Sequence, residues 1–417
     1  MMFLKAAASL LLSSTLALAQ VEPPLVANTV PVEYEHEGDA LLGHLSVPEG
    51  DGPFAGAYNV CFSWEGVGGG YEQTRATMVT EEWNMVGFAA DIYGADLQVV
   101  ANRTERIELA NLYRGDPLLF SERIQSAVDL IKAHEKVDPT QIALLGYCFG
   151  GTGVLQYSLS GYGDDVAAVV SFHGGLSQIP EPNATVAPKI LLLSGGDDDT
   201  STQIMDMETT LDAAGAHWEI TRYSGIEHAF TVWQDDRFNE WADFRAWSSA
   251  SSFILEAFGI TEFISAKPEE EIMLIAVNYT GVDGTPLTGH LALPGPFWER
   301  PLPAVVVYPD WDGANSYEKE RASMLAQEGY VAFAADIYGS DKQTVEEIPQ
   351  RIEEVTKYRS DPDLYVSRMQ DAIDQVKALS DDVDPDEIAI IGYCFGGSGV
   401  VLFAASNTTD AKVAVPL

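Results

Sequence analysis

Short apolar runs alternate with segments of helical periodicity along most of this chain. The apolar runs have the length of buried strands and are rich in β-branched residues. They span residues 166–172, 189–195, 304–309, 330–336 and 388–393. Residues 116–135 instead carry apolar side chains at helical spacing, with Asp116 and Pro117 where an N-cap and a first-turn proline stand. This alternation predicts an α/β fold with a mainly parallel sheet covered by helices on both faces.

The pattern occurs nearly twice. Asp91 in "AADIYGAD" is matched by Asp336 in "AADIYGSD", and "GYCFGGTG" around Cys148 returns as "GYCFGGSG" around Cys394. Matching segments in the same order and register indicate a duplicated domain. The expected parts are a complete first copy at 30–258, a polar linker at 259–270 and a second copy at 271–417 that is truncated after its cysteine turn.

Composition narrows the classes of function. The chain has 417 residues, 46% of them hydrophobic, which is enough for two buried cores. Its formal net charge of −40 would repel nucleic-acid phosphates, so we expect no nucleic-acid partner. The first 19 residues resemble a secretory signal, with cleavage after Ala19 and a secreted or periplasmic product. The alternative is a membrane anchor, but the apolar run is short for a full span, and no later segment is long enough for one.

The cysteine motif has a specific setting in both copies. A strand runs through Gly-x-Cys-x-Gly into a helical segment, which is typical of a sharp turn that exposes a nucleophile at its tip. The small residues Gly146, Gly150 and Gly151 allow the flanking chains to pass closely. The start of the following helix favours negative charge and so a thiolate. The alternative, a buried structural cysteine, leaves the glycines unexplained. Three cysteines are too few for a disulfide framework.

A thiol nucleophile needs a base and a group that orients the base. In the first copy, Asp197, Asp198 and Asp199 follow one strand, and a loop bearing His228 follows the next. The order nucleophile, acid, histidine is that of α/β-hydrolases. His173, which also follows a strand, is the rival to His228. The pattern itself leaves the choice among the three aspartates open.

These segments resemble the dienelactone hydrolase family, which consists of cysteine-dependent α/β-hydrolases. The resemblance rests on "GYCFGG", "AADIYG", "GGDD" and "YSGIEHAF", and it covers nearly all of the first copy and the front of the second. It implies a triad of Cys148, Asp198 and His228, and an oxyanion hole formed by the backbone N–H groups of Trp64 and Phe149.

Two positions depart from the family pattern. Ser63 stands where the family has a glutamate that contacts the resting thiol, and Val232 stands where it has an arginine that binds a substrate carboxylate. Arg114, repeated as Arg359, is a candidate for substrate binding or for a salt bridge, and Ser63 is a second candidate for substrate binding.

The expected function is therefore hydrolysis of lactones or small carboxylic esters through a thioester acyl-enzyme, with a small-molecule substrate and no cofactor or metal. Cys394 is the nucleophile equivalent of the second copy, but the sequence contains no counterpart of Asp198 or His228 after it. A non-catalytic extracellular binding protein on the same fold is the alternative. A redox-sensing thiol is weaker, because no resolving cysteine lies nearby in the sequence.

Overall fold

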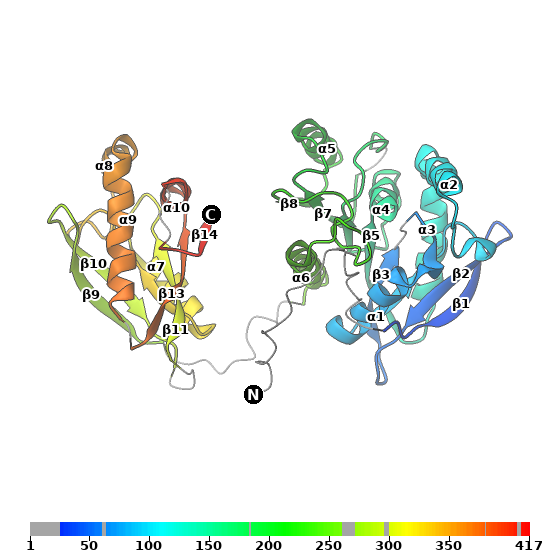
Figure 1. The fold of residues 1–417 in the computed structure, drawn as a ribbon, viewed down its shortest axis with the longest axis horizontal. Coiled ribbons are helices and arrows are strands. Elements are labelled where there is room, and N and C mark those ends of the chain that lie inside the picture. The colour runs from blue at the N-terminus through cyan, green and yellow to red at the C-terminus, as the bar shows by residue number, and fades with distance from the viewer. Residues whose placement is uncertain are drawn as a thin grey trace, which may run out of the picture. The chain divides into compact units, whose positions relative to one another are not determined.

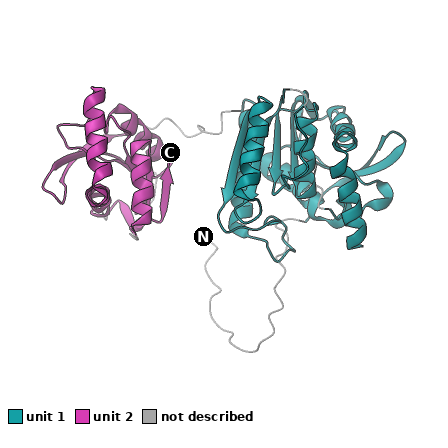
Figure 2. Cartoon of the chain, turned by 90° about the horizontal axis from the view of Figure 1, so that it is seen from above, with its two compact units in different colours: residues 1–261 teal, residues 262–417 magenta. Residues whose placement is uncertain are grey.

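The computed structural model describes residues 26–60, 64–182, 185–260, 272–295, 300–379, 381–406 and 410–417. The expected signal segment and Ser63 lie outside these residues, as does most of the expected linker. The chain divides into two compact units, residues 1–261 and 262–417 (Figure 2). Within the part that is described, no helix combines the length and apolar character needed to cross a bilayer.

Unit 1 is an eight-stranded sheet with helices on both faces (Figure 1). Its elements in chain order are β1 (Val30–His36), β2 (Asp39–Ser46), β3 (Phe54–Val60), α1 (Tyr71–Trp83), β4 (Val86–Ala89), α2 (Arg103–Gly115), α3 (Pro117–Lys132), β5 (Val137–Tyr147), α4 (Phe149–Leu159), β6 (Ala168–Phe172), β7 (Lys189–Gly195), α5 (Ser201–Ala213), β8 (Trp218–Tyr223) and α6 (Glu240–Ala257).

The strand order is β1-β2-β4-β3-β5-β6-β7-β8. The strands from β4 through β8 are parallel, while β2 runs antiparallel to both of its neighbours. Strands β6 and β7 are buried almost throughout, because helices cover both faces at the centre of the sheet. The expected helix at 116–135 is α3, and the Asp116 side chain caps it by accepting a hydrogen bond from the Leu119 N–H. The α/β class predicted from the sequence is confirmed.

Two apolar clusters sandwich the sheet of unit 1. One contains Ile124 of α3, Leu155 of α4 and Leu211 of α5. The other contains Val79 of α1 and Ile254 of α6. Because the strands from β4 through β8 are parallel, their carboxyl ends lie at the same edge of the sheet. Sites in sheets of this kind lie at that edge.

Unit 2 repeats the first six strands of unit 1. Its elements are β9 (Leu274–Thr280), β10 (Pro286–Ala292), β11 (Leu302–Tyr308), α7 (Ser316–Gln327), β12 (Val331–Ala334), α8 (Ile348–Ser360), α9 (Pro362–Lys377), β13 (Val383–Gly392), α10 (Phe395–Ala405) and β14 (Val413–Pro416). The strand order, β14-β13-β11-β12-β10-β9, is that of β6-β5-β3-β4-β2-β1. One helix and one strand follow the second cysteine turn, and β14 pairs only with β13 among the described strands.

Candidate active site

Cys148 lies at the tip of a sharp turn between β5 and α4. Its φ of 52° and ψ of −110° are rare for a residue with a side chain and indicate local strain. Close backbone packing holds the bend, since a Cβ on Gly146 would come within 2.2 Å of the Gly150 carbonyl oxygen. The turn predicted from the glycine pattern is present, and it presents the sulfur at the carboxyl end of β5.

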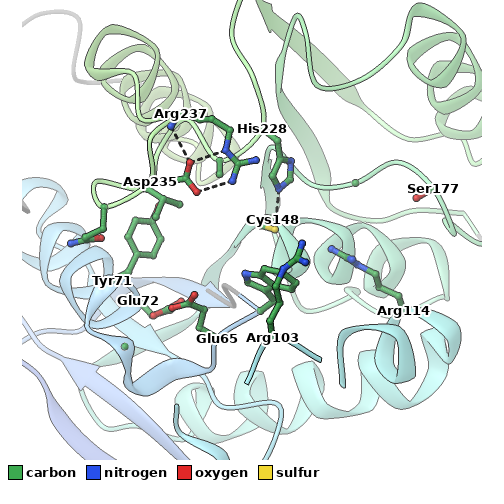
Figure 3. A pocket seen from close by; sticks show the side chains of 16 residues that line it. Glu65, Tyr71, Glu72, Arg103, Arg114, Cys148, Ser177, His228, Asp235 and Arg237 are labelled. Atoms are coloured by element: carbon green, nitrogen blue, oxygen red, sulfur yellow. Dashed lines mark hydrogen bonds and ion pairs between the residues drawn. The ribbon is translucent and has the colours of Figure 1, made fainter. Parts of the chain in front are cut away.

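His228 and Asp198 meet this sulfur from two neighbouring strand ends. Asp198 follows β7, and His228 lies in the loop after β8. The His228 Nε2 atom is 3.0 Å from Cys148 Sγ, and its Nδ1 is 2.9 Å from an Asp198 carboxylate oxygen (Figure 3 shows the contact with the sulfur). The structure thus brings together all three residues that the family resemblance proposed as a triad, in the geometry of nucleophile, base and orienting group.

The three groups shift one another's proton affinity. Burial alone would raise the pKa of the Cys148 thiol, but the hydrogen bond and charge of His228 outweigh it, with help from the Arg114 charge and the Phe149 N–H, and lower it. Burial alone would lower the pKa of His228, but the Asp198 carboxylate and the Cys148 sulfur raise it to about 10. Both shifts favour a thiolate beside an imidazolium, and two groups that interact this closely titrate as a unit.

The rival candidates occupy other roles. His173 is buried beneath the turn, where its Nε2 bonds to the Thr231 hydroxyl at 2.8 Å, and burial, together with the nearby charge of His228, holds its pKa well below the ordinary value. Asp199 accepts a hydrogen bond from the Ser194 hydroxyl at 2.8 Å. Of the three aspartates, Asp198 is the one placed against His228.

A pocket of about 660 Å³ opens over Cys148 and His228. Trp64, Arg103, Arg114 and Val232 are among the residues that line it (Arg103 and Arg114 are labelled in Figure 3). Its mixed lining of aromatic, aliphatic and charged side chains suits a small organic molecule with a polar group.

The loop that bears Trp64 is tied to the segment before α2. The Val100 N–H donates to the Glu65 carbonyl at 2.7 Å, and Arg106 bonds to both the Glu65 carboxylate and the Val100 carbonyl. Unit 2 repeats this brace, with Val345 N–H donating to the Asp312 carbonyl at 2.8 Å. These hydrogen bonds position Trp64 beside the pocket. They were not predicted from the sequence, because Glu65 lies 35 residues from Val100 and 41 residues from Arg106.

The arginines near the pocket differ in their partners. Arg237 forms two hydrogen bonds of 2.7 Å with Asp235. Arg114 lies over the Phe149 ring, 5.4 Å from its centroid, and its buried Nε atom has no hydrogen-bond partner in the part of the chain that the structure describes. Over the described ranges, neither Arg103 nor Arg114 has a carboxylate within salt-bridge distance. Arg114 therefore does not form, among the described residues, the salt bridge that was the alternative expected for it.

The cysteine turn of unit 2 has the same backbone but different surroundings. Cys394 has a φ of 49°, and its side chain is exposed. Within the described part of unit 2, no histidine or carboxylate bonds to its sulfur. The strained turn is thus present in both units, and the acid and histidine are present in unit 1.

An eight-stranded, mainly parallel sheet with a nucleophile turn after its fifth strand defines an α/β-hydrolase. The comparisons with known proteins give the family. Residues 70–258 and 289–416 match the model described as "Dienelactone hydrolase family", so the chain belongs to that family and both units are part of the match.

The chain is similar to curated and solved proteins of this kind. A "Putative carboxymethylenebutenolidase" of Aquifex aeolicus (strain VF5) is 25% identical over 228 residues, which cover 53% of this chain and 96% of that protein. A second protein of the same description, from Synechocystis sp. (strain ATCC 27184 / PCC 6803 / Kazusa), is 33% identical over 129 residues, 30% of this chain and 51% of that protein. A crystal structure described as "Dienelactone Hydrolase-like Promiscuous Phospotriesterase P91 from Metagenomic Libraries" superposes with a TM-score of 0.50 at 22% identity, over 55% of this chain and 98% of that one. The structural likeness shows the fold, and with the family match it supports a dienelactone hydrolase-like hydrolase.

Proposed function

We propose that unit 1 hydrolyses lactones or small carboxylic esters through a thioester on Cys148. The observation that carries the proposal is the pair of contacts on His228, 3.0 Å to the sulfur and 2.9 Å to Asp198. This arrangement supplies a nucleophile, a proton donor and a group that fixes the imidazole.

The reaction follows from these positions. The Cys148 thiolate attacks the acyl carbon while the Phe149 and Trp64 N–H groups stabilise the negative oxygen. The C–O bond to the leaving oxygen breaks, and His228 donates its Nε2 proton to that oxygen. Water then attacks the thioester carbon and gives a proton to His228, and the C–S bond breaks to restore the thiolate. In a lactone the leaving oxygen stays tethered to the acyl group, so ring opening gives a single hydroxy acid.

The internal duplication provides a matched control for this mechanism. We expect Cys148→Ala to lower kcat for 4-nitrophenyl acetate by about 10⁴-fold or more, because the nucleophile is lost. Cys394→Ala should leave kcat unchanged. Intact mass spectrometry of wild type mixed briefly with the ester should show one acyl group, mapped to Cys148. Equal losses from both variants, or acylation of Cys394, would contradict the assignment to unit 1.

A lack of hydrolysis of every ester and lactone tried, in a protein whose Cys148 is still intact, would instead favour the binding-protein alternative. Bound ligand would then be detected without turnover.

We further propose that the preferred substrate carries an anionic group bound by Arg114. Its guanidinium faces the pocket and has no carboxylate partner among the described residues, and it is close enough to Cys148 for its charge to help lower the thiol pKa. A carboxylate on the substrate would give this arginine a charge-assisted hydrogen bond. Arg103, which lies 5.7 Å from the centroid of the Trp64 ring at the same pocket, adds positive charge there.

A comparison of two esters tests this substrate class. For Arg114→Gln we expect kcat/KM for mono-4-nitrophenyl succinate to fall about 10- to 100-fold, the value of a hydrogen bond to a charged group. The neutral 4-nitrophenyl acetate should lose much less, and Arg359→Gln, the exposed counterpart in unit 2, should change neither. An equal loss for both esters would mean that Arg114 acts on the thiol alone.

We propose separately that the protein is exported and that its first 19 residues are removed. If the N-terminal segment is a signal, mature protein recovered from its native host should begin at Gln20. N-terminal sequencing decides this, and a product that keeps Met1 would contradict it.

A further inference from the structure

A chain of buried hydrogen bonds runs from the backbone of Cys148 to helix α6. The Cys148 N–H is shared between the Phe172 carbonyl at 3.0 Å and His173 Nδ1 at 3.2 Å. His173 Nε2 is 2.8 Å from the Thr231 hydroxyl, which in turn is 2.7 Å from the Tyr71 hydroxyl. None of these side chains has a step in the mechanism above, so their role is separate from the triad, although the Tyr71 side chain also lines the pocket (Figure 3).

The far end of the chain is an arginine with no access to solvent. Arg75 of α1 donates from Nε to the Tyr71 hydroxyl at 3.2 Å, and from Nη2 to the Thr231 carbonyl at 2.8 Å and to Asp243 of α6 at 2.6 Å. Its guanidinium also lies 4.3 Å from the centroid of the Trp233 ring. One side chain thus connects α1, α6 and the loop that carries His228.

The donors at both ends fix the directions of the bonds that they make. A backbone N–H and a guanidinium can only donate, so His173 Nδ1 accepts from Cys148 and the proton of the ring lies on Nε2. Nε2 then donates to the Thr231 hydroxyl. The bond between the Thr231 and Tyr71 hydroxyls can run in either direction, because each oxygen can donate and accept. Burial together with the nearby His228 charge holds the pKa of His173 well below its ordinary value, which agrees with this neutral form. His173 also has a φ of 40°, a strained backbone that its surroundings must enforce.

Thr231 is the key link, because it lies three residues after His228 in the same loop. Its hydroxyl bonds toward the nucleophile turn, and its carbonyl bonds to Arg75. The spacing between Cys148 Sγ and His228 Nε2 is therefore set by two loops that are connected to each other through His173.

Unit 2 shows what the first helix of the repeat does without these partners. Tyr317 and Arg321 occupy the positions of Tyr71 and Arg75, and Arg321 lies 4.8 Å from the Tyr317 ring centroid. Tyr317 is exposed there, and over the described residues neither side chain forms a bond like those to Thr231 and Asp243. The aromatic and arginine pair belongs to the repeat, whereas the network is built only where the histidine loop and α6 pack on it.

We propose that His173, Thr231 and Tyr71 are positioning residues that hold the nucleophile turn and the His228 loop in register for catalysis. This inference rests on the proposed function, in which Cys148 and His228 act together.

Conservative variants of the full-length protein test it. Thr231→Val keeps the shape and removes the hydroxyl, Thr231→Ser keeps the hydroxyl, and Tyr71→Phe removes one oxygen atom. We expect Thr231→Val and Tyr71→Phe each to lower kcat for 4-nitrophenyl acetate about tenfold, with KM changed much less, because each change removes two buried hydrogen bonds. Thr231→Ser should stay close to wild type. Tyr317→Phe is the matched control in unit 2 and should change nothing.

A second readout does not require turnover. Carbamidomethylation of Cys148 by iodoacetamide, followed by peptide mass spectrometry, reports the thiolate that His228 maintains. It should slow in Thr231→Val and Tyr71→Phe but not in Thr231→Ser.

The outcomes separate the two proposals. Wild-type kcat and alkylation in Thr231→Val would overturn the positioning role, as would equal losses in Thr231→Val and Thr231→Ser. If Thr231→Val does not fold, Tyr71→Phe decides in the same way. Cys148→Ala is run in the same assay: if it still hydrolyses the ester, the proposed function fails, and the alkylation rates alone judge the network.

Discussion

At Cys148 the effects of burial and of neighbouring charge oppose each other, and the charge prevails. The thiol pKa is lowered while that of His228 is raised to about 10, so both groups are ionised between these two pKa values. The raised pKa of His228 stabilises the fold most fully below the ordinary histidine value, and this contribution is lost as the pH rises through about 10. The lowered thiol pKa contributes above the ordinary thiol value, and this contribution is lost as the pH falls through the folded pKa.

Activity should follow the same two limits. We expect kcat/KM for a neutral ester to rise as the pH passes the lowered thiol pKa, and to fall as the pH rises through about 10, where His228 loses the proton that the leaving oxygen needs. The pH dependence of initial rates checks this. A descending limb near the ordinary histidine pKa would mean that the ion pair does not form in the free enzyme.

The Asp198 carboxylate is one cause of the raised pKa of His228. Asp198→Asn should lower kcat about 100-fold or more, since the imidazole loses both its orientation and its counter-charge. The descending limb should move to lower pH and the ascending limb to higher pH. Asp197→Asn, next to it in the same turn, is the control and should leave the profile unchanged. A wild-type profile in Asp198→Asn would exclude this carboxylate from the triad.

The turn from β5 to α4 can form only because Gly146 has no side chain to collide with the backbone of the following helix. In Gly146→Ala the new Cβ would meet the Gly150 carbonyl oxygen at 2.2 Å, and in Gly392→Ala of unit 2 the matching contact is 2.3 Å. Each change should destabilise its own unit by about 3 kcal/mol, at the upper end of overpacking effects. Hydrogen exchange resolved by peptide measures the two units separately. Esterase activity should be lost only in Gly146→Ala, and full activity there would show that the bend can relax.

Helices α1 and α6 are connected through the ion pair of Arg75 and Asp243. Arg75→Ala should destabilise unit 1 by about 3–5 kcal/mol, because Asp243 is left largely buried without its partner. Arg321→Ala, at the part-exposed counterpart in unit 2, should cost less than about 0.5 kcal/mol. Exchange rates of the slowest amides in α1, α6 and α7 give both values. Similar values for the two variants would mean that the buried pair adds nothing beyond surface packing.

For the molecule as a whole, the net charge of −40 implies strong self-repulsion. Between about 10 mM and about 1 M NaCl the Debye length falls from about 30 Å to about 3 Å, which screens most surface charges from one another. We therefore expect the thermal midpoints of both units to rise with NaCl by a few degrees. Calorimetry at fixed protein concentration checks this, and a fall in either midpoint would indicate that attractive ion pairs dominate that unit.

The sequence predicted what is local or repeated. The period of apolar residues gave α3 and the buried strands, and the duplicated glycine motif gave both cysteine turns. The order of motifs placed an aspartate triplet and a histidine loop near Cys148, because parallel strands end at one edge of the sheet, and the family resemblance selected Asp198 and His228. The network through His173, Thr231 and Arg75 could not be predicted, since its bonds, apart from that between Arg75 and Tyr71, join residues 25 to 168 positions apart and no local pattern marks them.

The second cysteine turn keeps its positive φ of 49° with no imidazole bonded to its sulfur within the described residues. The contortion is therefore maintained by the close-packed glycine backbone and not by catalytic partners. Any side chain small enough for the tip, serine included, should be displayed in the same way without refolding the bend. In a repeat of this kind the turn forms without the triad partners, so the residue at its tip can change, or lose its catalytic role, while the fold stays the same.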